Sequence, residues 1–128
     1  MAEILVVDDD ANNRLLVQAV ARHYGHTVHQ AATGEEALEF CAGKRVDLII
    51  LDLGLPGMDG AELLRRLRRD ATMRRVPVAL YTASEPNAAM RHFMEMYGVE
   101  HVIDKPTEPE ELRRAIERAI SDSGALEH

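Results

Sequence analysis

Hydrophobic and polar positions along the chain follow a pattern that predicts strands and helices in strict alternation. Five short apolar segments recur at similar intervals, and three of them are nearly continuous runs of aliphatic residues, as expected for strands covered on both faces. The segments are Glu3–Val7, Thr27–Ala31, Val46–Leu51, Val76–Tyr81 and Val99–Ile103. Between them, apolar residues recur at intervals of three and four, which is the spacing of an amphipathic helix.

Hydrogen-bonding side chains and glycines mark the predicted helix ends. Thr33, Asp59 and Thr107 are each followed three residues later by a glutamate, which is the spacing of a capping box. Asp10 is a candidate cap for the first helix. Three glycines stand where helices should stop, namely Gly25, Gly43 and Gly98.

The alternation predicts an α/β fold with a doubly wound, five-stranded parallel sheet and helices on both faces, because parallel neighbours need right-handed crossover connections. We expect residues 1–120 to form one domain and residues 121–125 a short tail. The final Leu126-Glu127-His128 is similar to the start of an expression tag and is not expected to belong to the fold. The natural protein could be longer than this segment.

Composition and charge narrow the class of protein. Fifteen Lys and Arg against twenty-two Asp and Glu give a net charge of −7, which argues against direct nucleic-acid binding. No apolar run approaches the ~20 residues of a membrane span, and no signal-peptide-like leader opens the chain. The single cysteine, Cys41, excludes a disulfide framework and a thiolate metal cluster. We therefore expect a cytoplasmic domain that binds no membrane.

Polar residues that could bind a ligand or take part in a reaction follow the predicted strands. In open parallel sheets, ligands bind beyond the carboxyl ends of the strands. The residues at these ends are Asp8-Asp9-Asp10, Ala32-Thr33, Asp52, Thr82-Ala83-Ser84 and Lys105-Pro106. A sheet edge that gathers acidic, cationic and hydroxyl groups in this way differs from a generic surface.

The strand-end residues fit a site for phosphoryl transfer. If the first and third strands are neighbours, Asp8, Asp9 and Asp52 converge and repel one another unless a cation lies among them. Oxygen ligands alone suit Mg²⁺, or Mn²⁺ in its place. Lys105 would add a second positive charge and Thr82 a hydroxyl donor. Metal, ammonium and hydroxyl together could clamp three phosphoryl oxygens while a carboxylate attacks phosphorus in line.

Four segments in order, each at the predicted end of a strand, resemble the receiver domain of bacterial two-component response regulators, as in chemotaxis receivers. The segments are Val6–Asp10, Leu51–Gly60, Tyr81–Ala83 and Asp104–Pro106. The resemblance covers essentially the whole chain before the tail. It implies a flavodoxin-like (βα)₅ fold. It also implies a domain that is not an enzyme, apart from catalysing its own phosphoryl transfer and autodephosphorylation.

The resemblance also assigns roles to residues. It implies Asp52 as the phosphoacceptor, Asp8 and Asp9 as the pair that binds Mg²⁺, and a backbone carbonyl ligand from Gly54. Thr82 would contact the phosphoryl group, and Lys105 would pair with its oxygens. The bond from Lys105 to Pro106 is expected to be cis.

The resemblance further implies partners. The phosphoryl donor would be a phosphohistidine on a sensor histidine kinase or a phosphotransfer protein. Phosphorylation would switch the binding of a downstream protein partner, act on a fused output domain, or promote a homodimer. The sequence does not choose among these.

The chain departs from the family pattern at three positions. Receivers often carry an aromatic residue three positions before the lysine, where this chain has Val102. Tyr81, Tyr97 or His101 could report phosphorylation instead. Gly54 and Ser84 are small at positions that control water access in the family, which predicts an open site.

Two alternatives use part of the same chemistry. A haloacid-dehalogenase-like phosphatase would use Asp8 as nucleophile and Asp10 as acid/base, but Asn12 does not fit its motif and the chain leaves no room for a cap domain. A flavodoxin-like electron carrier would need a Ser/Thr-rich phosphate loop after the first strand, where this chain is acidic.

Two further groups of residues are interpreted as surface features. Six arginines between residues 65 and 75 are interpreted mainly as a solvated helix face, with a docking patch for an acidic partner as the less favoured reading. They are Arg65, Arg66, Arg68, Arg69, Arg74 and Arg75. The histidines His23, His26 and His29 lack metal-site spacing and are expected to be surface or strand residues.

Overall fold

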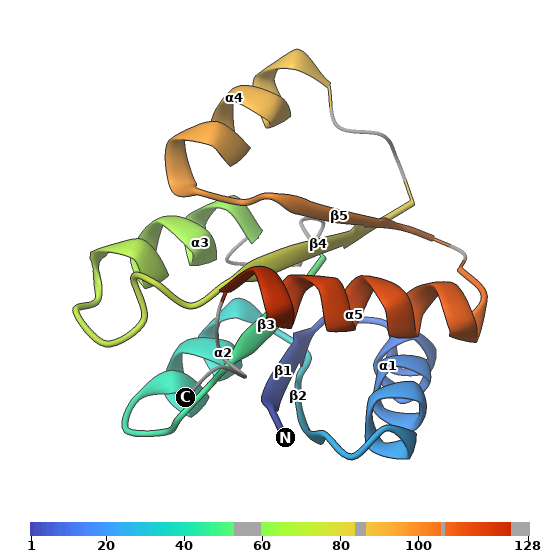
Figure 1. Cartoon of the computed structure of the whole chain (residues 1–128). Helices are drawn as coiled ribbons and strands as arrows, with labels where there is room; N and C mark the ends of the chain where they lie inside the picture. Colours follow the sequence, from blue (N-terminus) through green and yellow to red (C-terminus); the bar gives the residue numbers. More distant parts are fainter. Residues whose placement is uncertain (53–59, 84–86, 106, 124–128) are drawn as a thin grey trace.

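The computed structural model describes residues 1–52, 60–83, 87–105 and 107–123, and strands and helices alternate throughout (Figure 1). The strands are β1 (Glu3–Val7), β2 (Thr27–Ala31), β3 (Leu48–Leu51), β4 (Val78–Thr82) and β5 (His101–Asp104). The helices are α1 (Ala11–His23), α2 (Gly34–Cys41), α3 (Gly60–Arg69), α4 (Ala88–Tyr97) and α5 (Pro109–Ser123). None of the helices described is both long enough and apolar enough to cross a membrane.

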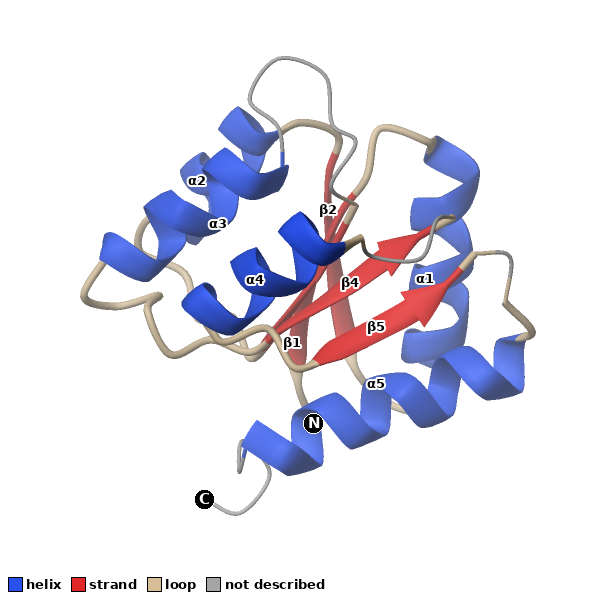
Figure 2. Ribbon diagram, turned by 90° about the horizontal axis from the view of Figure 1, so that it is seen from above, coloured by secondary structure: helices blue, strands red, loops and turns tan. Residues whose placement is uncertain are grey.

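The strands form one parallel sheet in the order β2-β1-β3-β4-β5, with β3 at its centre. Helices α1 and α5 cover one face, and α2, α3 and α4 cover the other (Figure 2). This is the predicted doubly wound α/β fold. The order places β1 between β2 and β3, so the carboxyl ends of β1 and β3 lie side by side.

Alternate residues of each inner strand enter opposite core layers, because successive side chains of a strand point to opposite faces. Leu5 and Ile49 pack with the layer under α2 and α3, whereas Ile4 and Ile50 pack with the layer under α1 and α5. All four side chains are essentially inaccessible to solvent. Each such aliphatic side chain stabilises the fold by roughly 1.5–3 kcal/mol through its removal from water.

Strands β3, β4 and β5 begin two residues later than predicted, for local reasons. At β3, the Asp47 carboxylate accepts the Glu3 N–H at 2.7 Å, in place of a backbone carbonyl of the ladder. At β4, Pro77 has no N–H to donate to the sheet. At β5, the Val99 N–H is already donated to the Met94 carbonyl at the end of α4. Strands β4 and β5 each extend one residue further than predicted.

Two of the predicted helix caps are confirmed. The Asp10 carboxylate accepts the Asn12 N–H at 2.8 Å, and the Thr33 hydroxyl accepts the Glu36 N–H at 3.1 Å. Asp59 lies outside the described residues. Thr107 is not the residue before a helix, because α5 begins at Pro109, a residue whose missing N–H suits a first helical position.

The predicted glycine stops are also confirmed. Gly25, Gly43 and Gly98 follow α1, α2 and α4, and all three have positive φ. Gly98 is the clearest case, since it ends α4 in the left-handed conformation with φ of 68°. A residue with a Cβ atom would be strained there.

His26 was expected to be a surface or strand residue, but it is buried in the turn before β2, with only 7% of its surface exposed. Its Nδ1 accepts the Ala2 N–H at 3.1 Å, and its Nε2 lies 2.8 Å from the Glu117 Oε1. The imidazole therefore links the start of β1 to α5. Both partners are distant in sequence, so the local pattern around His26 did not reveal its burial.

Candidate functional site

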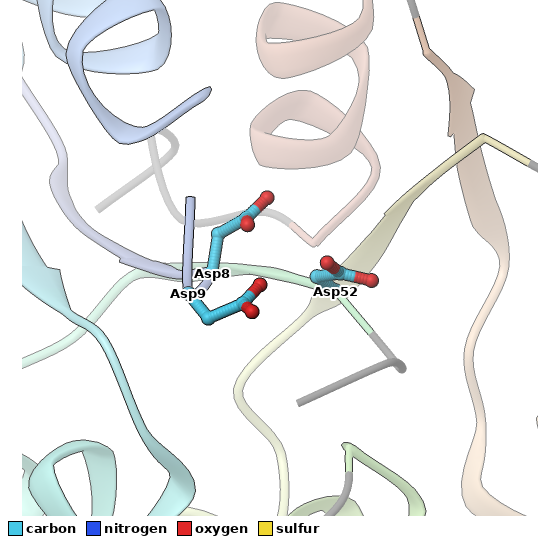
Figure 3. Close-up of side chains that lie close together, drawn as sticks. All are labelled: Asp8, Asp9 and Asp52. Atoms are coloured by element: carbon cyan, nitrogen blue, oxygen red, sulfur yellow. The ribbon is translucent and has the colours of Figure 1, made fainter. Parts of the chain in front are cut away.

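The candidate site lies at the carboxyl ends of β1 and β3, which the sheet places next to each other (Figure 3). Val7 pairs with Leu51 in the ladder, so Asp8 and Asp52 follow it directly. The ladder continues past the strand, because the Asp52 N–H donates to the Val7 carbonyl at 2.9 Å. The backbone therefore holds both acidic residues where two buried strands stop.

Three carboxylates converge at this edge, as predicted. One carboxylate oxygen from each of Asp8, Asp9 and Asp52 lies within 4.8 Å of the others. Asp8 is 1% exposed, Asp52 is half-buried and Asp9 is exposed, so the cluster runs from the interior to solvent. At this spacing the negative charges repel one another strongly, and a cation among them lowers their energy.

Lys105 supplies a cation from the chain itself. Its Nζ lies 2.7 Å from the Asp8 Oδ2 and 3.3 Å from the Asp52 Oδ2. Burial alone would lower the pKa of Lys105, but hydrogen bonds and charge interactions with Asp8 and Asp52 outweigh burial and raise it. The ammonium therefore stays protonated at neutral pH.

The position of Lys105 is fixed by its neighbours on β4 and β5. Its backbone N–H donates to the Thr82 carbonyl at 2.8 Å, directly after the pairing of Thr82 with Asp104. Its Nζ lies 4.9 Å from the centre of the Tyr81 ring, which is buried beneath it. This distance suits a cation–π interaction. The strand pairing and the aromatic ring together hold the ammonium beside the carboxylates.

Thr82 and Val102 lie where the strand pattern predicted, near the end of β4 and within β5. Thr82 is the last residue of β4 and is half-buried. Val102 pairs with Leu80 and packs against the core layer under α2 and α3. Gly54, Ser84 and Pro106 lie outside the described residues, and so do the predicted Gly54 carbonyl ligand and the cis bond before Pro106.

The turn after β1 is held by contacts that the sequence analysis missed. The Asp10 N–H donates to the Asp8 Oδ1 at 2.9 Å, which fixes the buried carboxylate. Arg14 donates from Nη1 to the Asp8 carbonyl at 2.7 Å and from Nε to Gln30 at 3.0 Å. Arg14 lies one helical turn after the cap residue Asp10, and this position is the one signal that pointed to it.

The donor set fits a hard divalent cation. All three side chains offer oxygen atoms, which Mg²⁺ and Mn²⁺ prefer, and no sulfur or imidazole ligand accompanies them in the described cluster. Asp8 accepts hydrogen bonds at both oxygens, yet each oxygen keeps a further lone pair. Three carboxylates against one ammonium leave excess negative charge, which a divalent ion would balance.

Comparison with known proteins identifies the family. The chain matches the model of the response regulator receiver domain over residues 4–117, and it belongs to this family. Over 117 residues it is 41% identical to the sensor histidine kinase AruS of Pseudomonas aeruginosa. The aligned region is 89% of this chain and 12% of AruS. Over 109 residues it is 33% identical to sporulation initiation phosphotransferase F of Bacillus subtilis. The aligned region is 80% of this chain and 88% of that protein.

Solved structures agree with the family assignment. The chemotaxis protein CheY4 of Vibrio cholerae matches with a TM-score of 0.87 at 29% identity, over 93% of this chain and 98% of that chain. The signal receiver domain of a histidine kinase from Syntrophus aciditrophicus matches with a TM-score of 0.82 at 29% identity, over 95% and 92% of the two chains. The chain is therefore a phosphorylation-activated signalling domain of two-component phosphorelays.

The two alternative functions receive no support from these comparisons. The phosphatase alternative also conflicts with the geometry of Asp10, its required acid/base. The Asp10 carboxylate is exposed and accepts the Asn12 N–H as the cap of α1. It is thus a structural residue at the rim of the site.

Proposed function

We propose that Asp52 accepts the phosphoryl group from a phosphohistidine of a sensor histidine kinase or phosphotransfer protein. The observation that carries this is the position of Lys105, whose Nζ bridges the carboxylates of Asp8 and Asp52. Lys105 contacts both carboxylates, but only 1% of the Asp8 side chain is exposed, whereas 18% of the Asp52 side chain is exposed. Asp52 is therefore the better placed nucleophile.

The transfer exchanges one bond to phosphorus for another. A lone pair of an Asp52 carboxylate oxygen forms the new oxygen–phosphorus bond while the nitrogen–phosphorus bond of the phosphohistidine breaks. The bond pair stays on the imidazole nitrogen, which takes a proton from solvent. Lys105 stabilises charge on the phosphoryl oxygens, and Thr82 offers its hydroxyl to them.

Asp8, Asp9 and Asp52 would hold Mg²⁺, or Mn²⁺ in its place, together with the Gly54 carbonyl. When bound, the ion supplies charge neutralisation at the carboxylates and the phosphoryl oxygens. Asp8 is fixed by the Asp10 N–H, and the turn that carries Asp8 and Asp9 is tied down by Arg14. The protein therefore holds the Asp8 carboxylate and the backbone of this turn in place.

The wider role follows from the same site. The domain catalyses its own phosphorylation and autodephosphorylation, and it acts in the cytoplasm by switching a downstream partner, a fused output domain or a homodimer. Residues 1–120 form the body of the receiver domain, and α5 continues through Ser123, so residues 121–123 of the expected tail are the end of that helix. The family model match over residues 4–117 supports the extent of the domain.

Acetyl phosphate with Mg²⁺ tests the assignment of Asp52. We expect intact-protein mass spectrometry to detect one added phosphoryl group, and Asp52→Asn to abolish it. Asp8→Asn should slow the reaction because a metal ligand is lost. Beryllofluoride should bind stably to the unmodified protein and not to Asp52→Asn.

Asp10→Asn is the matched control, because Asp10 belongs to the same acidic run but caps a helix. Its phosphorylation should equal that of the unmodified protein. Undiminished phosphorylation of Asp52→Asn would overturn the assignment. Steady hydrolysis of a phosphomonoester that depends on Asp8 would favour the phosphatase instead.

A further inference from the structure

A groove lies at the edge of the sheet opposite the acidic cluster, where β4 and β5 begin. It has a volume of about 440 Å³ and lies among the α3–β4 connection, the α4–β5 connection and α5. Both connections lie on the left of Figure 1. Its lining residues include Arg68, Arg74, Arg75, Tyr97 and Glu100. This volume is within the range of small-molecule sites.

Arg68 places a partly buried positive charge at the wall of the groove. Its Nε donates to the Tyr97 carbonyl and its Nη1 to the Val76 carbonyl, both at 2.7 Å. Burial lowers the pKa of Arg68, yet a guanidinium remains charged in proteins. No carboxylate within the described residues forms an ion pair with it. An anion in the groove would balance this charge.

Arg74 and Arg75 add two exposed guanidinium groups to the same groove. Neither has an ion pair with a described residue, in contrast to Arg65 and Arg66, which both pair with Glu62. The arginine-rich segment therefore divides into two parts. Arg65 and Arg66 are neutralised by Glu62 on α3. Arg74 and Arg75 concentrate positive charge at the groove, although the net charge of the chain is −7.

The rest of the lining is chemically mixed. Pro77, Met96 and Tyr97 contribute apolar and aromatic lining, with the Tyr97 ring also packed against Phe93, and Glu100 contributes an exposed carboxylate. Arginines recognise phosphate in a bidentate manner, aromatic and thioether groups contact planar rings, and a carboxylate accepts hydrogen bonds from sugar hydroxyls. An inorganic anion would use only the arginines, whereas a nucleotide would use all three kinds of group.

We propose that this groove binds a small phosphorylated molecule of the nucleotide class, with its phosphates on Arg68, Arg74 and Arg75 and its ring on the Tyr97 wall. The inference does not rest on phosphorylation of Asp52. The site lies at the opposite edge of the sheet, so binding there would add a second, chemically distinct input to the domain.

Titration with ADP tests the proposal, in the presence of a chelator so that metal at the acidic cluster plays no part. Backbone amide NMR should show shifts confined to residues 68–78 and 96–101 and to the part of α5 around Ala119. The double substitution Arg74→Ala and Arg75→Ala should weaken ADP binding by about tenfold or more, since two charge-assisted contacts to phosphate are lost. Both residues are exposed, so the variant should fold normally.

The matched control is the double substitution Arg66→Ala and Arg69→Ala, which removes the same charge from exposed positions of α3 outside the groove. It should leave ADP affinity within about twofold. Equal weakening by both variants would overturn the site. Pyrophosphate that binds as tightly as ADP would overturn the nucleotide class, and the absence of shifts at millimolar ADP would overturn the proposal as a whole.

Both double variants should still be phosphorylated by acetyl phosphate, because neither alters the acidic cluster. A failure of the groove proposal therefore leaves the assignment of Asp52 untouched, and a failure of phosphorylation leaves the groove untouched.

Discussion

The two ends of the sheet treat polar groups in opposite ways. At the carboxyl end, three carboxylates converge on one lysine, and the charges do not cancel. At the opposite end, His26 contacts Ala2 and Glu117, and Asp47 accepts the Glu3 N–H. Among the described residues, no buried side-chain nitrogen or oxygen lacks a hydrogen-bond partner.

This difference separates groups that hold the fold from groups that are available for chemistry. The contacts of His26 and Asp47 at the opposite end join elements that are distant in sequence and are complete within the chain, unlike the guanidinium groups of the groove at that end. The carboxyl end keeps an excess of negative charge, which costs stability unless a further cation is present. Residues at this end are therefore expected to affect activity more than folding.

Removing the cation from the carboxyl end should give the largest effect. Lys105→Met should slow phosphorylation by acetyl phosphate by about 100-fold, the typical loss when one stabilising donor to a developing charge is removed. Quench-flow with mass detection measures the rate. Lys44→Met is the control, because Lys44 lies over Phe40 on the far side of the sheet and should leave the rate unchanged.

A rate for Lys105→Met within a factor of about three of the unmodified protein would contradict the role given to Lys105. Urea unfolding of the same variant in Mg²⁺ separates this role from a loss of folding. The variant should remain folded under the assay conditions.

Adding Mg²⁺, which would balance the negative charge of the acidic cluster, should raise the free energy of unfolding. Mg²⁺ at a hundredfold excess over its dissociation constant should raise the free energy of unfolding by about 2.7 kcal/mol, because it binds only the folded cluster. The gain should shrink in Asp9→Asn and in Asp52→Asn. It should persist in Asp10→Asn, and an equal gain in all four proteins would show that Mg²⁺ binds elsewhere.

Breaking a completed contact at the opposite end should affect stability alone. His26→Ala should lower the free energy of unfolding by about 2 kcal/mol, because the Ala2 N–H loses its acceptor and Glu117 its partner. Urea denaturation measures this loss. His92→Ala, at an exposed position on α4, should change stability by less than about 0.5 kcal/mol.

Phosphorylation of folded His26→Ala should proceed at the normal rate. A slowed reaction in the folded variant would remove the distinction between the two ends.

The smallest effect tests a structural residue within the acidic run. Asp10→Ala should cost about 1 kcal/mol of stability, the typical value of a lost helix cap. Thermal denaturation measures it. Asp10→Ser, which retains a capping oxygen, should recover most of the loss, and a failure of serine to do so would point to a role for the negative charge of Asp10.

The fold was predictable because its signals are local. Strand interiors such as Leu48–Leu51 are continuous aliphatic runs, and Gly98 ends a helix through a conformation that other residues avoid. The strand starts were less predictable, since they depend on whether a backbone N–H bonds within the sheet or to another acceptor. The Asp47 carboxylate replaces a ladder carbonyl, and no periodicity in the sequence encodes that replacement.

The site was predictable for a related reason. Asp8, Asp52 and Lys105 each follow a strand, and parallel strands bring their carboxyl ends to one edge. The supporting contacts were not predictable from these positions. Arg14 donates to a backbone carbonyl, and His26 depends on a glutamate 91 residues away, so neither contact leaves a pattern in the neighbouring sequence.

The positions of the start of β1 and the end of α5 determine where further domains could be attached. Strand β1 starts, and α5 finishes, at the edge away from the acidic cluster (Figure 1). Polypeptide appended at either terminus would therefore emerge at the edge away from the acidic cluster and leave that cluster accessible. This placement of the termini is compatible with relatives of very different length, since the chain matches 88% of sporulation initiation phosphotransferase F and 12% of the sensor histidine kinase AruS.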